Sequence, residues 1–114
     1  MYMILFVLDN PDLLDRLLDA WSEAGVTGVT ILESTGLHRR QQKRIPLRYL
    51  YGTDFPSEKA NQTLFAIVEG EDLVQACQLA TETVVGNLDD PNTGVFASWK
   101  LETVKGMHKF IPEQ

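Results

Sequence analysis

LDNPDLL at residues 8–14 and VEGEDLV at residues 68–74 are the two stretches that decide the fold. Each one closes an apolar run and then supplies a helix start with acidic residues in its first turn. The two stretches stand 60 residues apart, and the same offset aligns Leu17 with Cys77 and Ala20 with Ala80. The chain therefore repeats one strand–helix unit.

The elements around these stretches extend the repeat. We predict strands over residues 1–8, 28–33, 63–68 and 95–102, helices over 10–25 and 70–86, and a further short strand near Val104. The order is βαββαβ, which predicts an α+β ferredoxin-like sandwich: a four-stranded antiparallel sheet with two helices on one face. Right-handed crossovers leave little topological choice. At 114 residues the length predicts a single domain, 1–114.

Two helices cover only one face of such a sheet, yet the first strand is apolar on both. Ile4 and Phe6 alternate with Leu5 and Val7, and the third strand follows the same pattern. An uncovered face of this kind is a large apolar patch, which is typical of association surfaces. We therefore expect a homo-oligomer in which the open sheet faces pack together.

A long insertion, residues 37–61, separates the second and third predicted strands. It holds six of the ten basic residues of the chain and only two of its sixteen acidic residues. A loop of this length inside a small domain is uncommon and is usually functional. Apolar and aromatic residues are interleaved with its charges, so we expect a partner-binding loop. Its candidate contact residues are Arg44, Arg48, Tyr49 and Tyr51.

Charge and cysteine content narrow the function further. The net charge is −6, which argues against general nucleic-acid binding because phosphate contacts need an extended basic face. The single Cys77 excludes an internal disulfide framework and fits a reducing cytoplasm. The N-terminal apolar run has no basic residues before it, so it is read as a strand rather than a signal peptide.

The segment AGVTGVTILESTGL, residues 24–37, resembles the end of the first helix and the second strand of the PII nitrogen-regulatory proteins. The specific matches are Gly28-Val29-Thr30, Gly36 and the start of the last strand at Gly94-Val95-Phe96. The long insertion resembles the T-loop of that family. The likeness in element order covers nearly the whole chain.

This resemblance implies a cytoplasmic, homotrimeric signal-transduction protein. Its clefts between subunits would bind a small anionic effector, such as an adenine nucleotide, and its flexible loop would contact a target protein or membrane transporter. One side of each cleft would come from the second strand and the loop root, and the other from the turn before the last strand and from the C-terminal region. Carried over by position, the effector-binding residues are Gly28, Thr30, Gly36, His38, Arg39, Arg40, Asn92, Thr93, Gly94 and Lys105.

The chain departs from the family at the turn before the last strand. PII proteins have a glycine-rich phosphate cradle followed by lysine there, whereas this chain reads GNLDDPNTG at residues 86–94. It lacks the closely spaced glycines whose N–H groups wrap an anion, and Asp89 and Asp90 would repel a triphosphate. The pattern favours a PII-like relative with another nucleotide or effector.

Three alternatives stay open from the sequence. The basic insertion can be a solvated charge run, with its tyrosines as plain contact residues rather than modified ones. CutA-type trimers share the fold and are associated with divalent metals, but His38 and His108 are far apart and Cys77 falls on the core face of its helix, so no metal ligands are assigned. Ferredoxin-like folds also include small enzymes, but no nucleophile–base motif is present, so no catalytic residue is assigned and we expect a non-enzyme.

Overall fold

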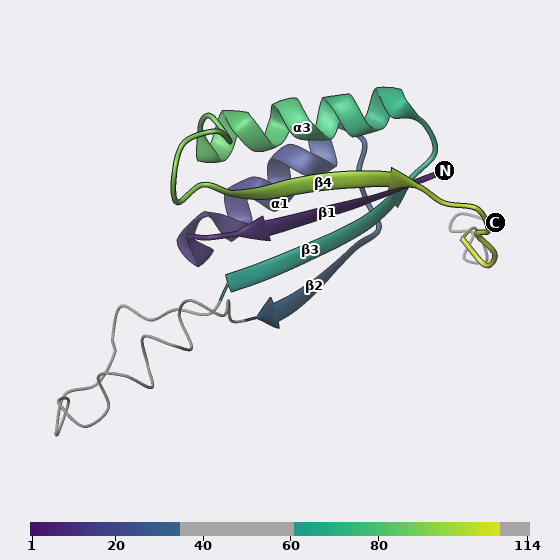
Figure 1. Cartoon of the computed structure of the whole chain (residues 1–114), viewed down its shortest axis with the longest axis horizontal. Helices are drawn as coiled ribbons and strands as arrows, with labels where there is room; N and C mark the ends of the chain where they lie inside the picture. Colours follow the sequence, from purple (N-terminus) through teal and green to yellow (C-terminus); the bar gives the residue numbers. More distant parts are fainter. Residues whose placement is uncertain (35–60, 108–114) are drawn as a thin grey trace, which may run out of the picture.

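The computed structural model describes residues 1–34 and 61–107 of the chain (Figure 1). The elements follow in the order β1 (Tyr2–Leu8), η1 (Pro11–Leu13), α1 (Leu14–Glu23), β2 (Val29–Ser34), β3 (Asn61–Val68), α3 (Glu71–Val85) and β4 (Gly94–Lys100). The strands form one antiparallel sheet in the order β2-β3-β1-β4, and both helices lie on the same side of it. This confirms the predicted α+β ferredoxin-like fold. The insertion expected at residues 37–61 lies outside the described residues, apart from Asn61, which begins β3.

The residues that begin and end the first helix adopt the conformations that the sequence indicates. The side chain of Asn10 accepts a 3.0 Å hydrogen bond from the Asp12 amide, and Pro11 occupies the first position of a short 3-10 turn that leads into α1. The helix ends at a left-handed Gly25, with φ of 102°. The Val26 amide then donates back to the Trp21 carbonyl at 2.9 Å, which is the backbone bond typical of a Schellman ending.

The core lies between the sheet and the two helices. Ile4, Phe6 and Leu8 of β1 are completely buried, and so are Leu17 and Trp21 of α1. Strand alternation and helical spacing bring these side chains into one layer. On α3 the fully buried positions are Cys77, as predicted, and Thr81, a polar residue that the apolar pattern did not mark.

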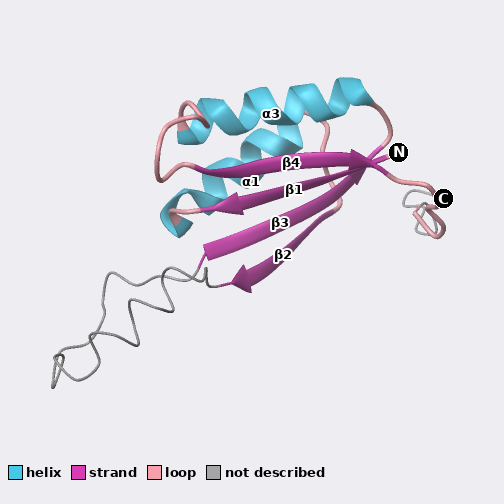
Figure 2. Cartoon of the chain, in the orientation of Figure 1, coloured by secondary structure: helices cyan, strands magenta, loops and turns pink. Residues whose placement is uncertain are grey.

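The opposite side of the sheet carries no described helix (Figure 2). We call it the open face, and by register and strand alternation it comprises Met3, Leu5, Val7, Thr30, Leu32, Phe65, Ile67, Val95, Ala97 and Trp99. Several of these large apolar side chains are exposed: Leu32 by 53%, Val95 by 60% and Trp99 by 46%. The apolar surface expected from the sequence is therefore present on the described part of the chain.

The C-terminal end differs from the prediction. β4 ends at Lys100, and residues 101–107 contain no strand, so the short strand expected near Val104 is wrong. The last ladder bond to β1 runs from the Leu101 amide to the Met1 carbonyl, and Gly106, with φ of 91°, turns the chain away. Neither described helix has the length and apolar character needed to cross a membrane.

Candidate functional site

The described part of the expected effector site falls into two separate regions. Gly28 and Thr30 lie at one end of β2, and residues 92–94 lie at the start of β4. The remaining candidates, at the loop root and along the insertion, lie outside the described residues: Gly36, His38, Arg39, Arg40, Arg44, Arg48, Tyr49 and Tyr51.

Gly28 and Thr30 open onto a pocket of about 230 Å³ at the edge of the open face. We call it the Gly28 pocket, and it is lined by Met3, Gly28, Thr30, Phe65, Ala66, Ile67 and Met107. Thr30 stands opposite Phe65 in the β2–β3 register and contributes the hydroxyl of an otherwise apolar lining. A Cβ built on Gly28 would meet nothing within 4 Å, so the space beside this glycine is open. The mostly apolar lining suits the apolar part of a small molecule.

Met107 brings the C-terminal region to this pocket, two residues after Lys105. The resemblance implies that Lys105 acts together with residues 92–94. In the structure, however, the segment that follows Lys105 reaches the Gly28 end of the sheet, while Gly94 pairs with Leu8 at the other end. Lys105 itself is exposed. Met107 therefore lies near the start of β2, at the other end of the sheet from Gly94.

The turn at residues 86–94 is organised by Asn87. Its Oδ1 atom accepts a 2.9 Å hydrogen bond from the Asp89 amide, and its carbonyl accepts another, also 2.9 Å, from the Asp90 amide. The hydroxyl of Thr93 donates to the Asp90 carbonyl at 3.0 Å. Amides already bonded inside the turn are not available to an anion, and the two aspartates are exposed beside them. The geometry disfavours a phosphate cradle at this turn.

Gly94 has a structural reason to be glycine. Its φ is 132°, and a Cβ at this position would lie 2.4 Å from the Val7 carbonyl oxygen and 2.7 Å from the Phe6 ring. Asn92, two residues before Gly94, has a φ of 64°, a left-handed conformation that asparagine tolerates better than most residues. These positions therefore shape the start of β4, whether or not a ligand contacts them.

The two strands that would frame the cleft lie on opposite edges of one sheet. A single register row runs from Gly94 through Leu8 and Gln62 to Glu33. Three strand spacings of about 4.8 Å separate the ends of this row by roughly 14 Å. Gly94 and Glu33 therefore do not meet within the described part of one chain.

Two of the described titratable groups have shifted pKa values. Burial raises the pKa of the Cys77 thiol to about 12, so the group is neutral and enclosed. The pKa of Tyr2 is raised first by desolvation and then by the neighbouring Glu71 carboxylate. Within residues 1–34 and 61–107, no three His, Cys, Asp or Glu side chains gather as a metal-binding group.

Comparison with known proteins adds no family assignment. No protein-family model matches the chain, and no curated protein matches it either.

The sequence reasoning missed Met107 as a lining residue. An apolar methionine two residues after the exposed Lys105 indicated a contact with the rest of the chain. The weak periodicity of the tail, however, did not predict which surface it would contact.

Proposed function

We propose that this chain is a non-catalytic, PII-like regulator: a homotrimer that binds a small anionic effector between its subunits and signals through the basic insertion at residues 37–61. The observation that carries the proposal is the apolar open face. A sheet side with Leu32, Val95 and Trp99 exposed is costly in water. Packing the open faces of three copies together would cover it.

The separation of the two candidate regions supports binding between subunits. Within one chain, Gly94 and Thr30 lie on opposite edges of the sheet, which three strand spacings separate by roughly 14 Å, and they are also offset along the strands. Assembly around the open faces would bring the open-face side of the 92–94 turn of one copy near β2 of the next and would leave the outer edge of β4 free. The two regions would then face each other across a subunit boundary.

The charge of the cleft would come from the loop root and the C-terminal region. Arg39 and Arg40 follow β2 in sequence, and Lys105 precedes the Met107 that lines the Gly28 pocket. Guanidinium groups bind carboxylate or phosphate oxygens through paired hydrogen bonds. The Gly28 pocket would hold the apolar part of the effector, and Asp89 and Asp90 would keep a long polyphosphate away from the 86–94 turn.

Signalling would follow from ordering of the loop by the effector. A ligand that binds one loop conformation more tightly than another shifts the population toward it. The outer part of the insertion, with Arg44, Arg48, Tyr49 and Tyr51, would then contact a target protein or transporter in only one of these states.

A thermal-shift panel tests this function. The purified protein is heated with adenine and guanine nucleotides, cyclic dinucleotides, 2-oxoglutarate, bicarbonate and divalent metals. A ligand at one hundred times its Kd adds about 2.7 kcal/mol of stability, which raises Tm by several degrees in a domain of this size. We expect a shift with one anionic class, lost in Arg39→Ala/Arg40→Ala and kept in Arg16→Ala, which changes an exposed arginine of α1.

Two results would overturn the proposal. A shift with divalent metals alone would indicate a CutA-like metal-binding protein. A shift that the double arginine variant retains in full would place the anion elsewhere on the chain.

A further inference from the structure

β4 forms an outer edge of the sheet. It pairs with β1 on one side, and in the described part of the chain no strand pairs with its other side. The strand reads GVFASWK, seven residues with no proline and one charged side chain, Lys100, at its end. Natural proteins usually protect such an edge with prolines, charges or a bulge, because its free N–H and C=O groups attract other strands. This edge has little protection.

The register identifies which backbone groups point outward. The Leu101 amide donates to the Met1 carbonyl, so the pair of residues 1 and 101 is a hydrogen-bonded pair of the antiparallel ladder. Such pairs alternate along a ladder, so residues 95, 97 and 99 also bond to β1. The N–H and C=O groups of Gly94, Phe96 and Ser98 therefore point away from β1, toward the free edge.

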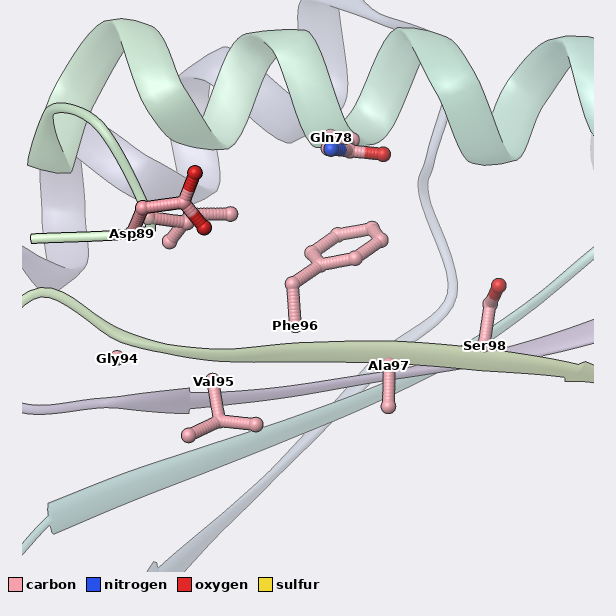
Figure 3. Close-up of a pocket in the computed structure, with 8 residues that line it drawn as sticks. Gln78, Asp89, Gly94, Val95, Phe96, Ala97 and Ser98 are labelled. Atoms are coloured by element: carbon pink, nitrogen blue, oxygen red, sulfur yellow. The ribbon is translucent and has the colours of Figure 1, made fainter.

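A groove runs along this same edge, between β4 and α3. It has a volume of about 450 Å³ and is lined by Gln78, Leu88, Asp89, Gly94, Val95, Phe96, Ala97 and Ser98. We call it the β4 groove. Figure 3 shows the Phe96 ring rising from β4 toward Gln78 of α3, while Val95 and Ala97 point to the other side of the strand. Phe96 and Ser98, whose backbone groups point outward, thus also present their side chains to the groove.

The groove is acidic at the end where β4 begins. Asp89 lines it and Asp90 is exposed next in the chain. The carboxylate of Glu82 lies nearby, 3.5 Å from the Leu88 amide. No lysine or arginine is among the lining residues in the described part of the chain. A ligand with a positive charge at this end would gain the better electrostatic fit.

We propose that the β4 groove docks an extended segment of a partner protein, which adds to the sheet as a fifth strand. The partner residue opposite Phe96 is branched and apolar and packs between that ring and Leu88. The partner residue two positions away, opposite Gly94, is lysine or arginine and meets Asp89. Two residues of one strand span about 6.8 Å, and their side chains share a face. Strand addition of this kind combines backbone pairing with side-chain pockets.

This site goes beyond the proposed effector function. The Phe96 and Ser98 side chains of the groove lie on the helix side of the sheet, whereas the trimer would use the open face. Docking at β4 and packing of the open faces can therefore occur together, and each is tested without the other.

The probe is a fluorescein-labelled peptide of seven residues, with lysine at position two, valine at positions four and six, and serine or threonine elsewhere. Its binding to the full-length protein is followed by fluorescence anisotropy at low salt. One control peptide carries N-methyl groups on the amides that pair with β4, and another has glutamate in place of lysine. Neither control needs any change to the protein.

Protein variants separate the backbone and charge contributions. Ser98→Pro removes an outward N–H and leaves the bonds of residues 97 and 99 to β1 in place. Asp89→Asn/Asp90→Asn removes the groove charge, and Asp15→Asn/Asp19→Asn makes the same charge change on the exposed side of α1. Circular dichroism verifies that each variant is folded.

We expect binding that Ser98→Pro and the N-methyl peptide weaken at least tenfold. The change to Asp89 and Asp90, or the glutamate peptide, should weaken it about threefold to tenfold, and the α1 variant should bind as the unchanged protein does. Absence of saturable binding, or equal binding of the N-methylated peptide, would overturn the proposal. It would also fail if Ser98→Pro altered the oligomeric mass, because the edge would then belong to contacts between copies.

Discussion

The indole Nε1 of Trp21 donates a 2.8 Å hydrogen bond to Oγ1 of Thr81, and the two residues stand 60 positions apart, the offset of the internal repeat. Equivalent positions of the two strand–helix units therefore touch where α1 crosses α3. The Thr81 hydroxyl donates its own hydrogen bond to the Cys77 carbonyl at 2.7 Å, so every polar side-chain atom of this fully buried contact has a partner. The bond joins the two halves of the fold at its centre.

Thr81→Val should destabilise the protein by about 1–3 kcal/mol, because it leaves the buried Trp21 N–H without an acceptor. Thr83→Val is the matched control. Thr83 is exposed on the same helix and its hydroxyl donates to the Leu79 carbonyl at 2.9 Å, so its loss should be small. Urea unfolding followed by tryptophan fluorescence measures both. Equal losses would show that the Trp21 bond contributes nothing specific.

Gly94→Ala should destabilise the fold by about 2–4 kcal/mol, since the residue has a positive φ and its new Cβ would collide with the Val7 carbonyl. Gly28→Ala should leave stability nearly unchanged, because its Cβ meets open space. The same variant should nevertheless weaken effector binding if the ligand fills the Gly28 pocket. Thermal unfolding with and without the effector separates the two effects. Loss of stability in Gly28→Ala would contradict this account of the pocket.

Alkaline pH should weaken the fold through Cys77. The thiol pKa is raised from 9.0 to about 12 in the folded chain, so the folded state keeps a proton that the unfolded state loses. This contribution is complete below pH 9 and disappears as the pH rises from 9 toward 12.

Urea unfolding between pH 8 and pH 10.5 should therefore show a loss of about 1–2 kcal/mol that is smaller in Cys77→Ala. Tyr2 acts in the same direction, since its pKa is also raised, so the comparison is made in a Tyr2→Phe background. In the native state at pH 8, Cys77 should react with a thiol reagent only as fast as the protein opens. An identical pH dependence in the alanine variant would rule out the thiol as the cause.

A charge on the open face should break the proposed assembly. Trp99→Glu places a carboxylate on the surface that three copies would bury, and we expect a monomer at micromolar concentration by light scattering. Leu79→Glu is the control, because Leu79 is 67% exposed on the outer side of α3, away from the open face. If both variants keep the mass of the unchanged protein, the open face is not the interface.

Element order and core positions could be predicted because local signals and tertiary packing agree. The alternation of β1 placed Ile4 and Phe6 on one face, which the structure shows to be the buried one, and Asn10 and Gly25 marked the ends of the first helical segment. The burial of Thr81 was not predicted, because it depends on the hydrogen bond from Trp21, 60 residues earlier in the chain. The apolar pattern of one helix carries no information about such a partner. The supposed strand near Val104 failed because residues 102–107 have no pairing partner along β1.

The candidate site was less predictable for a similar reason. The composition of the 86–94 turn indicated a poor phosphate cradle, and the bonds of Asn87 give the physical cause by occupying the amides of Asp89 and Asp90. The grouping of Gly28 with Met107 depends on how the C-terminal region turns at Gly106, which spacing alone does not encode. The β4 groove likewise could not be predicted, because it depends on how α3 packs beside the edge of β4.

The most direct test of the central claim is native mass spectrometry of the purified full-length protein, with and without the anionic ligand selected by the thermal-shift panel. The account predicts a species with three times the mass of one chain that takes up as many as three ligands. A monomer, or a trimer that binds no ligand from the panel, would contradict an effector-binding homotrimer.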